Sequence, residues 1–335
     1  METKGRWRHS DVIACTRAVV LVLAVFCVGV VSIGAAVRPY RVAVLTPGLS
    51  FLPVLAGLRE GLTQLGYVEG KDVTLMVENT QGEVSDLAQR AERLVALQPD
   101  VFVTMGTPHT RAAQQATSSI PIVFVRVGDP LYYGLAASYA SSQNNLTGVS
   151  VYSGPLAGKR LEILQEIAPE SKRILAVVAK DEGHARNAFQ HFAETAAKMG
   201  LQVLRQDVTT REELEHVLRT TPADAQDAIY HVPSFLVSAH IDLLIEKARR
   251  DKLPMIVHED SMVDRGALVS YGGHSHPMGK QAAKLVRNIL QGARPADLPI
   301  QTPDTLFLTI NVSTAREINL TLPLSLLERV DRMAE

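Results

Sequence analysis

The feature that most constrains the fold of this chain is an order of strand, loop, helix and glycine that occurs twice. The apolar run RVAVL precedes a polar loop and a segment at 51–65 with leucines at helical spacing, and Gly66 closes the unit. The same order returns as RILAVVA, a helical segment at 185–199 and Gly200. Short apolar strands that alternate with helices are typical of βαβ units with parallel sheets. The sequence therefore predicts an α/β protein made of two similar Rossmann-like lobes.

Further elements follow from the same periodicities and turn signals. The strands are expected at 41–45, 72–77, 101–105, 122–125, 147–152, 173–179, 203–208, 228–232, 255–258, 267–271 and 306–311. The helices are expected at 51–65, 84–97, 108–117, 131–140, 155–167, 185–199, 212–219, 235–250, 279–290, 313–318 and 324–333.

These elements divide the chain into three parts after its N-terminal segment. The first lobe is expected at 40–150 and the second at 151–266. Residues 267–335 are expected to return to the first lobe and to cross the hinge again. Several crossings would make a hinge of fixed direction, suited to closure on a ligand.

The ligand of such a protein is expected between the lobes, where the loops at the carboxyl ends of the strands converge. The turn Gly106-Thr107-Pro108 opens a helix, so it presents backbone N–H groups to an anion such as a carboxylate. Three pairs of loops correspond between the lobes: 46–48 with 180–182, 106–108 with 233–235, and 128–130 with 259–261.

The first 36 residues have the pattern of an export signal. Basic side chains precede an uninterrupted apolar run at 18–31, and small residues follow it up to Ala36. We expect a signal peptide at 1–36. The alternative is an uncleaved inner-membrane anchor, since the apolar stretch approaches the ~20 residues that span a bilayer. Both alternatives place the rest of the chain outside the cytoplasm, in the periplasm.

Cysteine usage and charge exclude several classes of function. Cys15 and Cys27 both lie in the predicted signal segment, so the exported part has no disulfide and no thiolate metal site. The 335-residue chain has a net charge of −1, without the basic excess of a nucleic-acid-binding protein.

Five segments in order resemble a known family. They are VTMGTPHTRAA, IPIVFVRVGDP, NNLTGVSVYSGPLAGKRLEIL, HEDSMVDRGALVSYG and INVSTAREINLTLPLSLLERVD. The chain resembles the ABC-transporter substrate-binding proteins of the tryptophan-binding-protein-like (ABC_sub_bind) family over nearly all of 40–333. The resemblance implies a type I periplasmic-binding-protein fold, a small ligand such as an aromatic amino acid, and a permease and an ATPase as partners.

The resemblance also implies roles for individual residues. Thr107 and Pro108 match the turn that receives the ligand carboxylate. Asp129 matches the Asp of an Asp-Pro motif, and Asp260 with Ser261 matches an Asp-Ser-Met segment. Tyr271 matches the strand that follows.

The chain departs from the family pattern at two places. Leu131-Tyr132-Tyr133 stands where a Gly-containing segment is usual, and Ser234-Phe235-Leu236-Val237 stands where a polar segment is common. Two interpretations remain open for Tyr132, Tyr133 and Phe235. They either select a more aromatic or apolar ligand, or pack in the core.

The expected mechanism is binding of a small carboxylate-bearing ligand, an amino acid or aromatic acid, by a monomer without cofactor. Backbone and hydroxyl donors at Thr107 would take the carboxylate. Asp129, Asp181 or Asp260 would hold an amino group, and aromatic neighbours would stack on a ring. The predicted ligand-binding residues are Thr46, Pro47, Thr107, Pro108, Asp129, Tyr132, Asp181, Ser234, Phe235, Glu259, Asp260 and Tyr271.

Two other functions are weighed against a transport receptor. The first is a membrane-anchored ligand sensor with the same lobes. The second is a metal-dependent enzyme, with His274 and His276 as zinc ligands and Glu259 as a third. Since the sequence has no nucleophile elbow, phosphate loop or dinucleotide fingerprint, we expect no enzyme.

Overall fold

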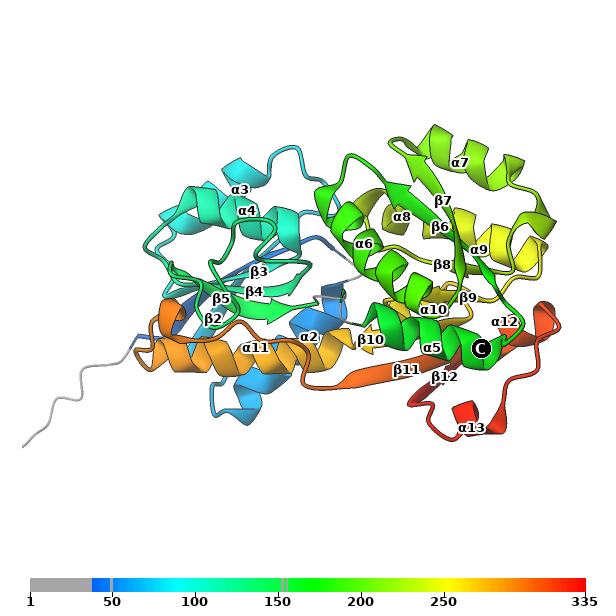
Figure 1. Cartoon of the computed structure of the whole chain (residues 1–335). Coiled ribbons are helices and arrows are strands. Elements are labelled where there is room, and N and C mark those ends of the chain that lie inside the picture. Colours follow the sequence, from blue (N-terminus) through cyan, green and yellow to red (C-terminus); the bar gives the residue numbers. More distant parts are fainter. Residues whose placement is uncertain (1–37, 49–50, 152–153, 155) are drawn as a thin grey trace, which may run out of the picture. The chain divides into compact units, whose positions relative to one another are not determined.

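The computed structural model describes residues 38–48, 51–151, 154 and 156–335 (Figure 1). The predicted signal segment, 1–36, lies outside these ranges. None of the helices that the structure describes has the length and hydrophobicity to span a bilayer.

The first sheet has five parallel strands in the order β2-β1-β3-β4-β5. Its central strands are apolar and buried along their whole length, as expected for a parallel sheet covered on both faces. The strands are β1 (Tyr40–Thr46), β2 (Val73–Asn79), β3 (Val101–Met105), β4 (Ile122–Val127) and β5 (Leu146–Ser150). The helices between them are α2 (Leu52–Gln64), α3 (Leu87–Ala96) and α4 (Thr107–Ala116).

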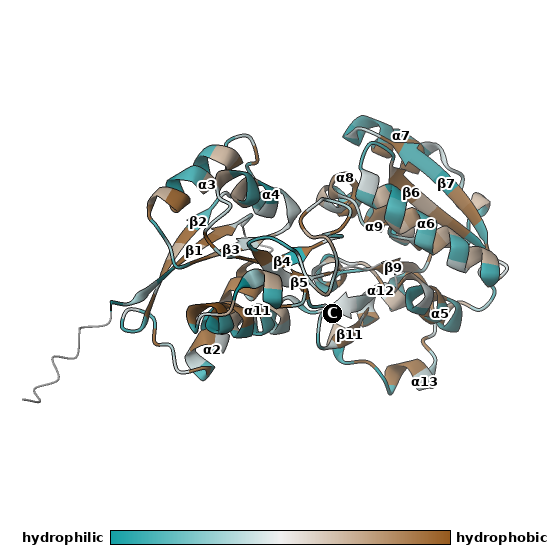
Figure 2. Ribbon diagram, turned by 60° about the vertical axis from the view of Figure 1, so that its left-hand side comes forward, coloured by the Kyte–Doolittle hydropathy of each residue, from teal (hydrophilic) through white to brown (hydrophobic). Residues whose placement is uncertain are grey.

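The second sheet has seven strands in the order β12-β11-β10-β9-β8-β6-β7, and β11 is antiparallel to β10. Figure 2 shows hydrophobic β6 beside hydrophilic β7, because β7 forms the sheet edge. The strands are β6 (Arg173–Ala179), β7 (Gln202–Val208), β8 (Ala228–Tyr230), β9 (Met255–Val257), β10 (Val269–Gly273), β11 (Leu306–Asn311) and β12 (Arg332–Ala334). The helices are α5 (Ala157–Ile167), α6 (Gly183–Lys198), α7 (Arg211–Thr220), α8 (Phe235–Ala239), α9 (Ile241–Arg250), α10 (Asp260–Asp264), α12 (Val312–Glu317) and α13 (Leu324–Leu327).

Helix α11 (Ser275–Leu290) follows the fifth strand of the second sheet but packs with the first sheet. In Figure 1 the orange α11 lies beside the blue α2. Glycines permit this close approach: a Cβ atom at Gly57 would lie 2.0 Å from the carbonyl oxygen of His276, and one at Gly279 would lie 2.1 Å from that of Val54. The chain therefore passes between the sheets after β5, after β10 and again before β11.

The expected α/β class with two mostly parallel sheets is confirmed, and most predicted elements agree within a few residues. The helix predicted at 131–140 is wrong, since this stretch consists of turns and bends. The Asp129 carboxylate accepts the N–H groups of Leu131 and Tyr132 at 3.0 and 3.2 Å, and Gly134 takes a φ of +65°. A local carboxylate–backbone turn thus replaces the helix.

Two further helix predictions need correction. The segment 235–250 is two helices, α8 and α9, which the apolar periodicity hides because it continues through His240. The segment 324–333 begins as α13 but ends in β12. Asp331 anchors that strand: its N–H donates to the Leu308 carbonyl at 3.0 Å, and its carboxylate accepts the Leu308 N–H at 2.7 Å.

Candidate functional site

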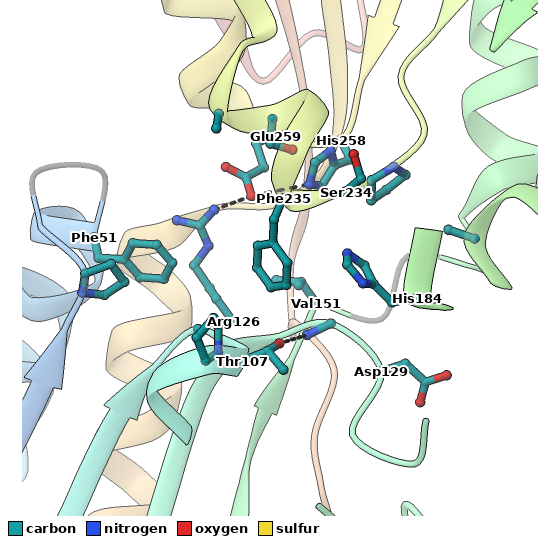
Figure 3. A pocket seen from close by; sticks show the side chains of 18 of the residues that line it. Phe51, Thr107, Arg126, Asp129, Val151, His184, Ser234, Phe235, His258 and Glu259 are labelled. Carbon is teal, nitrogen blue, oxygen red and sulfur yellow. Dashed lines mark hydrogen bonds and ion pairs between the residues drawn. The ribbon is translucent and has the colours of Figure 1, made fainter. Parts of the chain in front are cut away.

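A cavity of about 760 Å³ lies among the loops that follow the carboxyl ends of the strands in both sheets (Figure 3). Its size suits a small organic ligand. The residues from the first sheet and its loops are Pro47, Phe51, Gly82, Val84, Gly106, Thr107, Pro108, His109, Arg126, Gly128, Asp129, Val151 and Gly154. The residues from the second sheet and its loops are His184, Asn187, Ala188, His191, Pro233, Ser234, Phe235, Ser238, Ala239, His258, Glu259, Ser261, Met262 and Arg265.

The turn after β3 brings the first turn of α4 to this cavity. Gly106 has a φ of 81°, a conformation that glycine adopts without strain, and Pro108 lies in the first turn. The Thr107 hydroxyl accepts the N–H of Gly128 at 3.3 Å, which ties the turn to the loop after β4. Among the described residues, no carboxylate is bonded to the first turn of α4. This end of the helix is therefore available to an anionic group.

Arg126 is a cationic residue of the site that sequence reasoning missed. It lies at a bulge in β4, where the register with β5 shifts between Val125 and Val127, and its φ is 58°. The guanidinium carbon lies 4.4 Å from the centre of the Phe51 ring, and the guanidinium pairs with Glu259 (Figure 3). Only 6% of the side chain is exposed. An arginine inside the apolar strand IVFVRV was the signal that could have identified it.

Glu259 is the corresponding anionic group from the second sheet. It follows β9 and contacts His258 Nε2 at 3.3 Å, while the Ser261 hydroxyl donates to it at 3.3 Å. Burial opposes its ionisation, but Arg126 and His258 hold the pKa of Glu259 well below the usual range. The cavity wall thus contains an ion pair, Arg126 with Glu259, whose two members come from different sheets.

The turn after β8 corresponds to the turn after β3, but its N–H groups are already bonded. The Glu182 carboxylate accepts the N–H groups of Phe235 and Leu236 at 2.7 and 2.8 Å. The Ser234 hydroxyl caps α8 by accepting the N–H of Val237 at 3.1 Å. An internal carboxylate therefore occupies this helix start.

Aromatic rings form part of the cavity wall. The Phe235 ring lies 4.9 Å from the His184 ring, and 49% of Phe235 is exposed. Burial, with His258 nearby, lowers the pKa of His184 to about 4, so its ring is neutral at pH 7. His184 Nδ1 bonds the Tyr133 hydroxyl, and its Nε2 lies 3.2 Å from Glu182. The wall can therefore contact a planar or apolar ligand group.

Asp129 connects the loop after β4 to α6. Besides the two backbone groups described above, its carboxylate accepts a hydrogen bond from Asn187 at 3.0 Å. The adjacent Tyr132 lies against α6 as well, because a Cβ atom at Gly183 would overlap its hydroxyl. The segment that departs from the family pattern thus contacts α6, the helix after the first strand of the second sheet.

The structure places seven of the twelve predicted ligand-binding residues on the cavity: Pro47, Thr107, Pro108, Asp129, Ser234, Phe235 and Glu259. The other five are not among its lining residues. Thr46 is buried in β1, and Asp181 is exposed. Tyr132 lies against Gly183, as described.

The last two of these residues bond elsewhere. Asp260 lies 2.8 Å from His274 Nε2, and the Tyr271 carbonyl accepts a hydrogen bond from Arg160 at 2.8 Å. These contacts hold α10 and β10 in place behind the cavity.

The three side chains of the zinc hypothesis have separate partners. His274 pairs with Asp260, His276 lies 2.9 Å from Glu60, and Glu259 pairs with Arg126. Within the described ranges, no three His, Cys, Asp or Glu side chains are grouped as metal ligands. His274, His276 and Glu259 are therefore not brought together as one set of metal ligands.

Comparison with known proteins identifies the family. The model of the family "ABC transporter substrate binding protein" matches residues 41–334. The chain belongs to this family, and the resemblance seen in the sequence is confirmed. Its members are extracytoplasmic solute-binding receptors that bind small molecules and interact with an ABC permease.

The chain is similar to a named protein and to solved structures. A tyrosine-binding protein of Clostridioides difficile (strain R20291) is 25% identical over 264 residues, 79% of this chain and 76% of that protein. A conserved domain protein from Vibrio cholerae is 30% identical, with a TM-score of 0.79 over 88% of this chain and 100% of that one. An ABC domain in complex with L-Trp from Streptococcus pneumonia is 25% identical, with the same TM-score and coverage.

Proposed function

We propose that this protein is the extracytoplasmic receptor of an ABC importer and binds a small carboxylate-bearing ligand between two lobes. The first lobe comprises 40–150, the second comprises 151–266, and 267–335 returns to the first lobe and crosses the hinge. The ligand is an amino acid or an aromatic acid. Closure of the lobes around it presents the loaded receptor to the permease.

The observation that carries this proposal is the difference between the two corresponding helix starts. The start of α8 is bonded to Glu182, whereas the start of α4 faces the cavity beside the Arg126 guanidinium. A helix N-terminus and an arginine together favour a carboxylate. We therefore assign the ligand carboxylate to the first lobe, at Thr107 and Arg126.

The rest of the cavity is consistent with an amino acid. The Glu259 carboxylate is suited to an ammonium group, and Phe51, Phe235 and His184 provide surfaces for a ring. Tyrosine and tryptophan, named for two of the similar proteins, are therefore the first compounds to test.

The cellular context is part of the proposal. The receptor is exported to the periplasm, works as a monomer, and delivers its ligand to a permease driven by an ATPase. Mass spectrometry of the mature protein tests the export signal. A start at Val37 supports a soluble receptor, whereas an intact Met1 supports an anchored form or the alternative sensor.

A thermal-shift screen of L-amino acids and aromatic acids tests the ligand class. A ligand that binds the folded form raises the unfolding midpoint as its concentration exceeds Kd. Arg126→Met is expected to weaken a confirmed ligand roughly 10- to 100-fold, because a charged hydrogen bond contributes about 1.5–3 kcal/mol.

Arg205→Met is the matched control. Arg205 also stacks on a phenylalanine, at 4.6 Å from Phe189, and also pairs with a carboxylate, Asp207 at 2.8 Å. It lies on β7 and is not a lining residue of the cavity. A screen without hits, equal effects of the two variants, or chemical turnover of a bound compound would contradict the proposal.

A further inference from the structure

A row of hydrogen-bonding side chains runs along the cavity wall at the carboxyl ends of β8 and β9. It begins with Arg126 paired to Glu259, whose carboxylate lies 3.3 Å from His258 Nε2. His258 Nδ1 lies 3.0 Å from Nδ1 of His231, and His231 Nε2 lies 3.4 Å from the Ser238 hydroxyl. The two imidazoles are stacked, with centroids 4.9 Å apart and an angle of 24° between the planes.

The ionised state of Glu259 assigns the protons along this row. A carboxylate only accepts, so His258 carries its proton on Nε2 and leaves Nδ1 as an acceptor. His231 must then donate from Nδ1, which leaves its Nε2 to accept from Ser238. With both rings neutral, each bond has one donor and one acceptor.

We propose that His258 and His231 are positioning residues for ligand binding, which hold the Glu259 carboxylate against Arg126 and in line with the ligand. The proposal rests on the proposed function, since it assumes that Glu259 and Arg126 contact the ligand. His231 acts from behind the cavity, because it is 1% exposed and is not a lining residue. It reaches the cavity through its two bonded neighbours, His258 and Ser238, which both line it, and His258 in turn contacts Glu259.

Protonation of this pair disrupts the row. A proton on His258 Nδ1 would face the N–H of His231, so the bond between the rings would break unless His231 changed its tautomer. Burial lowers the pKa of both rings, most strongly that of His231. The positive charge of Arg160 opposes protonation of both imidazoles, and Arg126 also opposes protonation of His258. The Glu259 carboxylate favours protonation of both imidazoles. His184, from α6, is itself neutral and interacts with His258.

Ligand binding should therefore weaken as the solution becomes acidic. The ligand-bound form keeps the row intact and binds fewer protons, so Kd rises as pH falls through the lowered pKa values of these rings in the ligand-free folded protein. Linkage to one proton limits the slope to about tenfold per pH unit. Glu259 does not contribute in this range because its own pKa is well below its usual value.

Titration calorimetry between pH 7.5 and 5.0, with L-tyrosine and L-tryptophan as probes, tests this prediction. We expect Kd of the wild type to rise towards the acid end of the range, by no more than about tenfold per pH unit. His258→Ala should raise Kd at pH 7.5, and His258→Gln should recover part of that loss and flatten the pH profile, because the amide can donate and accept but does not titrate there. His231→Gln should also flatten it. His216→Gln, at an exposed position of α7, should keep the wild-type profile. A wild-type slope retained in both His258→Gln and His231→Gln would overturn the proposal.

NMR of the imidazole nitrogens in the ligand-free protein is a second test, and it needs no ligand. We expect the proton on Nε2 of His258 and on Nδ1 of His231, and Glu259→Gln should disturb both signals. Protons on Nε2 of both rings would overturn the assignment of the row, and with it the proposal. If neither L-tyrosine nor L-tryptophan binds, the ligand class in the proposed function is contradicted. The tautomers observed by NMR still test whether the hydrogen-bonded row exists.

Discussion

The turns after β3 and β8 occupy equivalent places in the two sheets, yet they differ in what their helix N-termini bind. At α8, the Glu182 carboxylate accepts two backbone N–H groups and Ser234 caps a third. At α4, the described residues place no carboxylate on the first turn, and Arg126 lies at the same cavity. A repeated fold therefore does not imply a repeated site. One turn is completed within the protein, and we propose that the other binds the ligand.

The two turns also differ in the length of helix behind them. Helix α4 has ten residues and α8 has five. The partial positive charge at an N-terminus arises from aligned peptide dipoles and from unbonded N–H groups, and both favour α4 as the anion site. Substitutions at either turn, and at the residues that support them, test this difference.

The substitution Thr107→Asp gives α4 the internal carboxylate that α8 already has. We expect ligand affinity to fall more than about 30-fold, since two like charges about 4 Å apart repel by about 4 kcal/mol at an effective dielectric constant near 20. Calorimetry measures the loss. Ser234→Asp is the control in the second lobe, because aspartate caps a helix as well as serine does. Equal losses in the two variants would remove the proposed asymmetry.

Acid should destabilise both lobes through a buried histidine in each. Burial lowers the pKa of His109 in α4, and of His184 in α6, to about 4 in the folded protein. The unfolded chain binds these protons near pH 6.5, so stability is full above that pH and is lost as pH falls towards 4. We expect a cost of up to about 2 kcal/mol per histidine at pH 5.

Thermal unfolding at pH 7.5 and pH 5 measures this effect. His109→Gln and His184→Gln should each reduce the pH-dependent change in the midpoint. A change that is the same in wild type and both variants would assign the acid sensitivity to other groups.

The substitution Glu182→Gln should affect stability more than binding. The neutral amide loses the charge that stabilises the start of α8, so we expect a loss of about 0.5–2 kcal/mol in the free energy of unfolding. Chemical denaturation measures it, and Asp181→Asn, at the exposed neighbouring position, is the control. A fall in affinity as large as that of Thr107→Asp would show that the second turn also binds the ligand's anion.

The smallest effect is expected for Asn187→Ala, which removes the bond between α6 and Asp129. This bond lies beside the cavity and joins segments of the two lobes. We expect affinity to fall about two- to fivefold, since a hydrogen bond contributes about 0.5–1.5 kcal/mol. Calorimetry measures the change, and no loss of affinity would exclude the Asp129–Asn187 bond from ligand binding.

The sequence predicted the strands better than the segments between them. A long apolar run such as RILAVVA strongly favours a buried strand, and β6 begins and ends at the same residues as this run. The helix expected at 131–140 failed because the Asp129 side chain bonds the backbone there, a competition that apolar periodicity does not reveal. The C-terminal strand β12 exists through its pairing with β11, a long-range contact.

Residues that line the cavity were predictable where a loop follows a strand, and Arg126 was missed because it lies within a strand. Thr107, Asp129, Ser234 and Glu259 were found from the loops of the repeat, and all line the cavity. Arg126 was overlooked because it belongs to the apolar strand β4, and the bulge that directs it towards the cavity depends on pairing with β5. Tyr132 and Asp260 were also predicted to bind the ligand, because they are close in sequence to cavity residues. Their side chains instead contact Gly183 and His274, which do not line the cavity.

The most direct test of this account compares an amino acid ligand with its amide. The amide keeps the ammonium group and the side chain but lacks the carboxylate that we assign to Thr107 and Arg126. Calorimetry of both compounds with the wild type and with Arg126→Met measures that interaction. We predict that the wild type prefers the amino acid by at least about tenfold, and that Arg126→Met loses most of this preference. Equal binding of the two compounds by the wild type, or an unchanged preference in the variant, would contradict the assignment of the carboxylate to the first lobe.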